Sequence, residues 1–291
     1  MRVALVDADE ISYKVALQFQ DTIYVVSRGN ERKGAYPSKA LAIESVAGDE
    51  SLDIIPEVVI KDLIDEDRII DEYISTILLN TNCTSIQLYL SGEDNFRYKM
   101  ATLLPYKGNR VGGNKPFYLE IIKDKLRDRG ATSISFLEAD DMMSSNIFSF
   151  DETVICSTDK DLRTVPSWNY NISTKLLQLI DEDTGRYNFY KQLLIGDSVD
   201  NIPSPWKLGE VTATKILNGM FGRSDKDYYQ YIIPHYLEFL KSKDKEGNYK
   251  TKWYSGQDID SILYEVGNLL WMRRTINPEE RWNIPMVHKN G

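Results

Sequence analysis

The chain has 291 residues, of which 42% are hydrophobic, so it can bury a sizeable core in one large domain or two modest ones. Its 44 acidic and 35 basic residues give a formal charge of -9, which argues against a protein that simply coats nucleic acid. No run of about 18 apolar residues occurs, and Asp7 interrupts the N-terminus before a signal-peptide core could form, so we expect no membrane association and a cytoplasmic location.

Hydrophobic periodicity predicts alternating strands and helices, followed by a mostly helical region. The predicted strands are residues 3–6, 23–27, 86–90, 132–137 and 153–157, with an edge segment at 168–172. The predicted helices lie within 58–79 and at 117–129, 139–148, 211–217, 228–240 and 259–274; a polar loop is expected at 37–48, a turn at 181–185 and a linker at 241–256. This alternation is typical of an α/β fold around a mainly parallel sheet.

Carboxylates follow four of these strands. They are Asp7, then Glu93 with Asp94, then Glu138 with Asp140 and Asp141, and finally Asp159 with Asp161. Because parallel strands present their carboxyl ends at one edge of a sheet, we expect these acids to converge. Taken alone, the acids from Glu138 to Asp141 are better explained as a helix start stabilised by the helix dipole. Their repetition after other strands favours a common site.

A basic segment is embedded in this acidic chain. Between Arg97 and Lys115 there are five basic residues and no acid. Residues 105–116 are rich in loop formers and too polar for a core, so the segment is expected to project over the surface; it lacks the Lys-Ser/Thr of a P-loop. Tyr98, Tyr106 and Tyr118 flank it, where their rings either stack on bases or pack as amphipathic surface residues.

Two features follow in the helical region. Asp197 and Asp200 lie three positions apart. The turn at 205–210, with Gly209, leads into the helix at 211–217 and would present backbone N–H groups to a phosphate, although an ordinary helix–helix turn explains the same pattern.

The residue types indicate the chemistry. The only histidines, His235 and His288, are not near a strand end, which disfavours histidine-based acid/base catalysis. Cys83 and Cys156 are too far apart for a zinc motif, and Cys156 lies in an apolar run, where burial is expected. Carboxylates favour Mg²⁺ or Mn²⁺, and their number exceeds the need of one octahedral ion. Two metal ions beside a basic segment would suit hydrolysis of a nucleic-acid backbone.

Three ordered segments resemble the signature motifs of the flap endonuclease and 5′→3′ exonuclease superfamily, especially its small bacteriophage exonucleases. They are residues 137–141, 157–161 and 196–203, within a similarity that extends from Asp7 to about Leu217. The resemblance implies a PIN-like nuclease core at residues 1–185, with a mainly parallel sheet flanked by helices and a helical basic arch at about 94–118. It also implies a helix-three-turn-helix DNA-binding element and further helices at 186–291.

The resemblance further implies an activity and its partners. The expected enzyme is a Mg²⁺- or Mn²⁺-dependent 5′→3′ exodeoxyribonuclease or flap endonuclease that uses two ions and leaves 5′-phosphate products. Its expected substrate is duplex DNA with a 5′ end, nick or flap, and possible substrates extend to the RNA of RNA–DNA hybrids. A monomer in the host bacterial cytoplasm, acting in phage DNA replication, recombination or host DNA degradation, is the implied setting.

Site residues are implied position by position. Asp7, Glu138, Asp140 and Asp159 resemble the inner metal-binding acids, and Asp141, Asp161, Asp197 and Asp200 resemble those of the second metal position and its surroundings. Either Glu93 or Asp94 corresponds to a further acid. Lys107 and Arg110 resemble the arch residues that hold the scissile phosphate. Lys207 replaces the first of two hairpin glycines, beside an expected K⁺ site. The DNA-binding residues are expected to be Arg97, Tyr106, Lys115, Lys207, Gly209, Thr212 and Lys215.

Two other functions stay open. A PIN-type ribonuclease would share the acidic core but would not need the hairpin element. A non-catalytic protein that binds DNA junctions is disfavoured by the acids themselves, because neutralising them would improve DNA binding.

Overall fold

The structure is a computed structural model that describes residues 2–110, 115–149 and 151–285. The chain forms two compact units. The larger contains Met1–Ala8, Ser75–Gly113 and Gly130–Gly291, and the smaller contains Asp9–Ile74 and Asn114–Arg129. These units are defined by contacts between residues, and they do not coincide with the expected functional boundary at residue 185. That boundary stays a prediction. No helix in the described ranges is long and apolar enough to cross a membrane.

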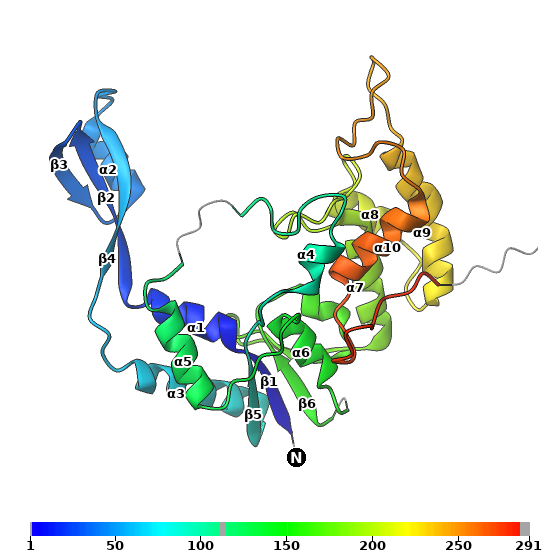
Figure 1. Cartoon of the computed structure of the whole chain (residues 1–291), viewed down its shortest axis with the longest axis horizontal. Coiled ribbons are helices and arrows are strands. Elements are labelled where there is room, and N and C mark those ends of the chain that lie inside the picture. Colours follow the sequence, from blue (N-terminus) through cyan, green and yellow to red (C-terminus); the bar gives the residue numbers. More distant parts are fainter. Residues whose placement is uncertain (1, 111–114, 150, 286–291) are drawn as a thin grey trace, which may run out of the picture. The chain divides into compact units, whose positions relative to one another are not determined.

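The larger unit is built on a five-stranded sheet in the order β5-β1-β6-β7-β8, part of which is labelled in Figure 1. The strands are β1 (Val3–Asp7), β5 (Ser85–Tyr89), β6 (Thr153–Cys156), β7 (Ser167–Tyr170) and β8 (Leu177–Ile180). β1 pairs in parallel with β5 and β6, β7 pairs in parallel with β6, and only β8 runs antiparallel. The apolar run Ala4-Leu5-Val6 is fully buried, as expected for a central parallel strand. The predicted α/β class with a mainly parallel sheet is confirmed.

One predicted strand does not form. Residues 132–137 contribute only an isolated bridge between Tyr89 and Thr132. The chain then crosses the end of β5 so closely that a Cβ on Gly92 would lie 1.9 Å from the Ile134 carbonyl oxygen. Gly92 N donates to Leu137 O at 2.8 Å. Thr132 N donates to Leu88 O of β5 at 2.9 Å, so the segment begins beside β5 and then bonds to the loop that follows this strand. This tertiary arrangement is one that the apolar pattern did not reveal.

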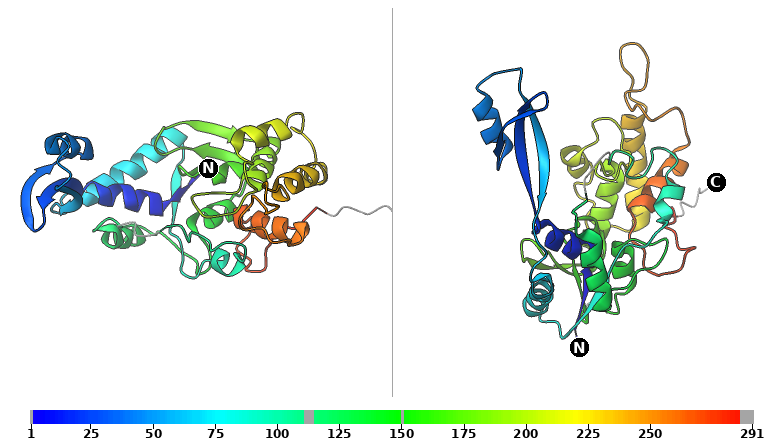
Figure 2. Two further views of the ribbon diagram at one scale, coloured as in Figure 1. Left: turned by 90° about the horizontal axis from the view of Figure 1, so that it is seen from above. Right: turned by 60° about the vertical axis from the view of Figure 1, so that its left-hand side comes forward.

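The helices of the larger unit include one that contacts the sheet and several that form a second core. They are α4 (Phe96–Met100), α6 (Ala139–Ser145), the short 3₁₀ helix η1 (Asp161–Thr164), α7 (Glu182–Ile195), α8 (Glu210–Ile216), α9 (Asp225–Leu240) and α10 (Ile259–Leu270). α6 contacts β1 and β5, whereas α7 contacts η1, α8, α9 and α10. Figure 2 shows the helices from α7 to α10 grouped together, in light green to orange. The stacked rings of Tyr190 and Tyr228, 4.7 Å apart, lie in the core of this group.

The smaller unit contains an antiparallel sheet of β2 (Gln20–Arg28), β3 (Glu31–Tyr36) and β4 (Asp53–Ile60) in the order β3-β2-β4. Its helical segments are α2 (Lys39–Val46), α5 (Leu119–Asp128) and most of α1 (Ala8–Leu17) and α3 (Glu66–Thr81). The predicted loop at 37–48 is wrong, because Ser38 caps α2 by accepting a hydrogen bond from Leu41 N. Residues 58–60 belong to β4 and not to the predicted helix, which begins at Glu66. The sequence of α2 carries little apolar periodicity, because the helix buries only Ala42.

Candidate active site

The predicted strand-end acids come from several elements of the larger unit. Asp7 is the last residue of β1, Asp140 lies in the first turn of α6, and Asp159 follows β6. Asp140 is half-buried with its Oδ1 atom fully covered, and the charges of Asp159, Asp7, Glu138 and Asp141 all act on its carboxyl group. The sheet and α6 therefore bring acids from distant parts of the sequence within electrostatic range of one another. We call Asp7, Glu138, Asp140 and Asp159 the acid group.

Asp140 is the least compensated member of the acid group. Its Oδ1 atom is buried and has no hydrogen-bond partner in the described part of the chain. Burial raises the pKa of Asp140 well above its ordinary range, and the carboxylate of Asp159 raises it further. A buried carboxylate oxygen without a donor is costly unless a cation compensates it. The oxygen-only set of acids fits a hard divalent cation such as Mg²⁺ or Mn²⁺.

Basic side chains form ion pairs with several of the acids. Lys107 Nζ lies 2.5 Å from Glu138 Oε1, and Arg110 forms an ion pair with Asp200. Tyr106 donates from its hydroxyl to Glu138 Oε2 at 3.0 Å and to Asp200 Oδ2 at 2.7 Å. Burial would raise the pKa of Glu138, but Arg97 and Lys107 hold it below its ordinary value. Within the described residues, no three His, Cys, Asp or Glu side chains form a ready metal-ligand group, which agrees with this pairing of acids with bases.

Asp197 and Asp200 are held by the loop that follows α7. Asp197 Oδ1 accepts from Val199 N at 2.7 Å, and its Oδ2 atom pairs with Lys160 Nζ at 2.9 Å. Burial would raise the pKa of Asp197, but the hydrogen bond and charge of Lys160 keep it below its ordinary value. Gly196 starts the loop with a φ of +62°, where a Cβ would lie 2.4 Å from the Ile202 carbonyl oxygen. The predicted motif at 196–203 is thus a tight loop that fixes two carboxylates.

Asp161 connects the acid group to α7. Its backbone N donates to Asp159 Oδ1 at 2.8 Å, and its carboxylate accepts a hydrogen bond from Gln192 of α7. Burial, with the charges of Asp159 and Asp197, raises the pKa of Asp161 to about 7. Asp161 is therefore electrostatically coupled to both of these predicted metal ligands.

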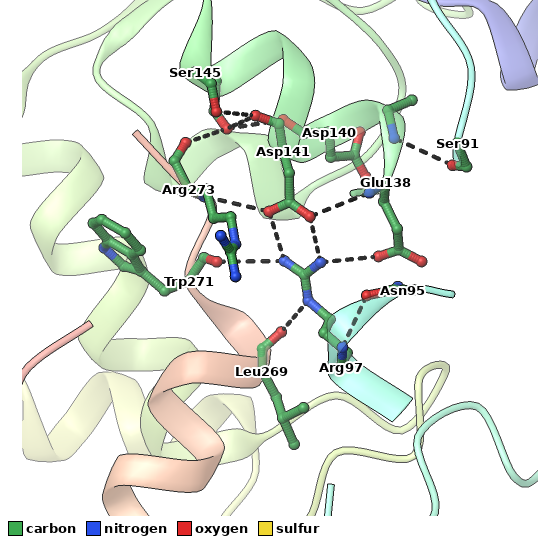
Figure 3. A network of polar contacts seen from close by, with 12 residues as sticks. Ser91, Asn95, Arg97, Glu138, Asp140, Asp141, Ser145, Leu269, Trp271 and Arg273 are labelled. Atoms are coloured by element: carbon green, nitrogen blue, oxygen red, sulfur yellow. Dashed lines mark hydrogen bonds and ion pairs between the residues drawn. The ribbon is translucent and has the colours of Figure 1, made fainter. Parts of the chain in front are cut away.

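Asp141 faces a different partner (Figure 3). Its carboxylate binds the Arg97 guanidinium through two contacts of 2.5 and 2.9 Å, and both side chains are almost completely buried. Arg97 also donates to the carbonyl oxygens of Leu269 and Trp271 and lies 3.3 Å from Glu138. This placement does not support metal binding by Asp141 or DNA binding by Arg97. Both hold the start of α6 against the chain around the end of α10.

The other predicted residues differ in exposure. Tyr106 is 4% exposed and bonds to acids, so its burial does not support stacking on a base. Asp94 is exposed, with a φ of +56°, and its role as a metal ligand stays a prediction. Lys115, Lys207, Gly209 and Lys215 are exposed and Thr212 is half-buried, which leaves them accessible to DNA. Residues 111–114 of the predicted arch lie outside the described residues; α4 is the only helix in the described part of 94–118.

Two residues with a role at the site were not predicted. Lys160 neutralises Asp197, and its position between Asp159 and Asp161 was a signal that could have identified it. Glu265 of α10 is 9% exposed and accepts hydrogen bonds from Thr102 N and Leu103 N, each at 2.8 Å. It thereby anchors the chain that leads to Lys107. No local pattern in the sequence points to Glu265, because its partners lie more than 160 positions away.

The comparisons with known proteins agree with this fold. No family model matches the chain. A 5′-3′ exonuclease of Buchnera aphidicola subsp. Schizaphis graminum (strain Sg) is 30% identical over 212 residues, which cover 65% of this chain and 73% of the relative. The crystal structure of the bacteriophage T5 D15 protein co-crystallised with metal ions has a TM-score of 0.55 at 13% identity, covering 93% of this chain and 89% of that one. The T5 D15 flap endonuclease in a pseudo-enzyme-product complex with DNA and metal ions gives a TM-score of 0.53 at 14% identity, over the same shares. The chain belongs to the flap endonuclease and 5′→3′ exonuclease superfamily.

Proposed function

We propose that this protein is a divalent-metal-dependent nuclease that hydrolyses DNA at or near 5′ ends, as a 5′→3′ exonuclease or a flap endonuclease. The observation that carries the proposal is the buried Asp140 oxygen without a partner, surrounded by the charges of Asp7, Glu138 and Asp159. A protein that only bound DNA would gain from neutral residues at these positions. The acids are explained if a cation holds them together during catalysis.

The acid group would hold one Mg²⁺ or Mn²⁺ ion, and Asp161, Asp197 and Asp200 would support a second. Ions bound there would supply an activated water and stabilise negative charge on the phosphoryl oxygens. Asp141 is left out of this set, because its carboxylate is already bound by Arg97. Its role is to position α6.

The basic residues would change partners when substrate binds. Lys107 and Arg110 now contact Glu138 and Asp200, so a phosphodiester entering the site would compete with these carboxylates. Their positive charge would then lie against the scissile phosphate, where it stabilises the transition state. Tyr106, buried between the same two acids, keeps them apart and hydrogen-bonded while the basic side chains move.

Residues 205–217 would hold the duplex beside the site. Lys207 and Lys215 are exposed basic side chains on either side of the start of α8, and exposed Gly209 is the helix N-cap. Such residues contact phosphates independently of base sequence. The structural similarity to the T5 D15 flap endonuclease, which was solved in complex with DNA and metal ions, supports DNA as the partner. A K⁺ ion at this turn, a monomeric state and a cytoplasmic, phage-related role remain parts of the same proposal.

The test uses duplex DNA labelled at the 5′ or 3′ end with a recessed end, a nick or a 5′ flap. We expect cleavage with Mg²⁺ or Mn²⁺, none with EDTA, and products that carry 5′-phosphates. The variant Asp159→Asn should lose cleavage by a factor of about 10³ or more while still binding the flap substrate. Metal-independent cleavage, or full activity of the variant, would overturn the proposal.

The same assay separates the alternative functions. Product sizes on flapped and recessed ends distinguish endonuclease from exonuclease activity. Preferential cleavage of single-stranded RNA would identify a PIN-type ribonuclease, and cleavage of the RNA strand of a hybrid would extend the substrate range. Tight binding of flapped DNA without turnover in Mn²⁺ would identify a junction-binding protein.

A further inference from the structure

A cavity of about 510 Å³ lies in the larger unit, and none of the acids discussed above lines it. Its apolar walls include Pro166, Phe189, Trp271 and Trp282. Its size lies within the range of small-molecule sites, about 300–1,000 Å³, which are typically lined by aromatic and apolar side chains with a few polar groups. The cavity thus has the size and lining of a ligand site.

Arg274 is a charged residue of this cavity whose hydrogen bonding is incomplete. Its Nη2 atom donates to Thr164 O at 3.2 Å, whereas its Nη1 atom is buried and has no partner among the described residues. The guanidinium takes part in no ion pair among these residues, and its carbon lies 5.2 Å from the centroid of the Trp271 ring. The carboxylate of Glu280 accepts from the backbone N of Arg274 at 3.0 and 3.2 Å, and its charge acts on the guanidinium. Burial lowers the pKa of Arg274 to about 10, so the group is still a cation at neutral pH. A buried guanidinium nitrogen without an acceptor is costly unless a ligand supplies one.

The remaining charged residues of the cavity are compensated or solvated. Arg186 lies 2.8 Å from Asp183 and 3.2 Å from the lining residue Asp225. Glu182 also lines the cavity, but it is exposed, so water solvates its carboxylate. Arg274 therefore presents a positive charge with one buried, unpartnered nitrogen beside aromatic walls.

We propose that this cavity binds a small planar organic phosphate of the nucleoside 5′-monophosphate class. The phosphate accepts hydrogen bonds from the Arg274 guanidinium, whose planar donors match a phosphate group. The ring packs against the indoles of Trp271 and Trp282, which supply apolar area. No metal is needed at this site, which distinguishes it from the acid group. The inference stands on the cavity alone and does not depend on the proposed nuclease activity.

Isothermal titration calorimetry in EDTA tests the proposal with three probes: dAMP, deoxyadenosine and inorganic phosphate. We expect dAMP to bind with a Kd of about 1 mM or below and the other two at least about tenfold more weakly. Deoxyadenosine lacks the phosphate that binds Arg274, and inorganic phosphate lacks the ring that packs against the indoles. The variant Arg274→Gln should weaken dAMP binding at least about tenfold, and Arg274→Lys, which keeps the charge but not the planar donors, should weaken it less.

Two control variants separate this cavity from other cationic sites. Arg163→Gln removes an exposed arginine of η1 that does not line the cavity, and Lys107→Ala removes the cation beside Glu138. Neither should change dAMP binding. Far-UV circular dichroism checks the fold of each variant, and the milder Arg274→Lys change keeps the test decisive if Arg274→Gln unfolds. No dAMP binding at 10 times the expected Kd of about 1 mM, unchanged binding by the Arg274→Lys variant, equal binding of phosphate alone, or loss with Lys107→Ala would overturn the proposal.

Discussion

Arg97 and Asp141 form a bidentate ion pair, with Nη1–Oδ2 and Nη2–Oδ1 distances of 2.5 and 2.9 Å. Both side chains are at most 1% exposed, so neither charge is solvated by water. Arg97 also donates to Leu269 O at the end of α10. The pair therefore connects the first turn of α6, which carries Asp140, to a helix more than a hundred residues further along the chain.

Replacement of Asp141 by Asn should destabilise the protein strongly. The variant leaves the Arg97 charge buried without a counter-ion, which typically costs about 3–5 kcal/mol. Urea unfolding followed by circular dichroism measures the loss. The double variant Arg97→Met/Asp141→Leu removes both charges and should recover most of it. A loss below about 1 kcal/mol for Asp141→Asn would show that the pair contributes little.

Replacement of the neighbouring Asp140 by Asn should have the opposite effect on stability. Burial and the charges of Asp159 and Asp7 raise the pKa of Asp140, so its ionised form is unfavourable in the folded protein. Removing that charge should leave the urea midpoint unchanged or higher, while nuclease activity with Mg²⁺ is lost. The two variants differ by one position and make the same chemical change. If Asp140→Asn unfolded as readily as Asp141→Asn, the carboxylate would have a structural partner.

Gly196→Ala should be far more harmful than a comparable change at another glycine with positive φ. Its added Cβ would lie 2.4 Å from Ile202 O and 2.7 Å from Pro203 O, in a backbone conformation with φ of +62°. Gly219 has a φ of +82° but no atom within 4 Å of the added Cβ, so Gly219→Ala carries only the conformational cost of about 1 kcal/mol. The difference in unfolding free energy between the variants should exceed about 1 kcal/mol. Equal losses would show that the loop at Asp197 adapts freely.

Two buried thiols should report global and local unfolding separately. Burial raises the pKa of Cys83, and Cys156 is fully buried in β6, between β1 and β7. Since the thiolate is the reactive form, neither should react quickly with DTNB at pH 8 in the native protein. Cys83, between α3 and β5, should react before Cys156 as urea is raised, because the central strand opens only on global unfolding. Rapid native labelling of Cys156 would contradict this order.

The sequence predicted the elements whose signal is local. The apolar runs at β1, β5 and β6 and the acids after them are recognisable by themselves, because a buried parallel strand requires a continuous apolar run. The missed features depend on contacts distant in sequence. Residues 132–137 look like a strand, yet they bond to the loop at Gly92. Arg97 looks like a surface cation, yet it is buried against Asp141. A sequence pattern indicates the charge of a side chain but not the partner that folding provides.

Glu265 is a second example of a partner that the sequence conceals. Its carboxylate accepts from Thr102 N and Leu103 N, each at 2.8 Å, and from the Thr102 hydroxyl. These bonds attach the chain just after α4 to α10. Four residues beyond Leu103, Lys107 reaches Glu138, so the position of this basic residue depends on the anchor.

Glu265→Ala should therefore loosen the segment that carries Lys107 and Arg110. Two backbone amides lose their acceptor, at a cost of about 1–3 kcal/mol each where they remain buried. We expect faster tryptic cleavage after Lys107 and Arg110 and a fall in kcat/KM of about tenfold or more on a flap substrate, because the phosphate-binding charges are no longer held in place. Glu265→Gln keeps a carbonyl oxygen as acceptor and should lose less by both measures. If Glu265→Ala left proteolysis and kcat/KM unchanged, the segment would be held by its contacts with Glu138 and with residues 198–201.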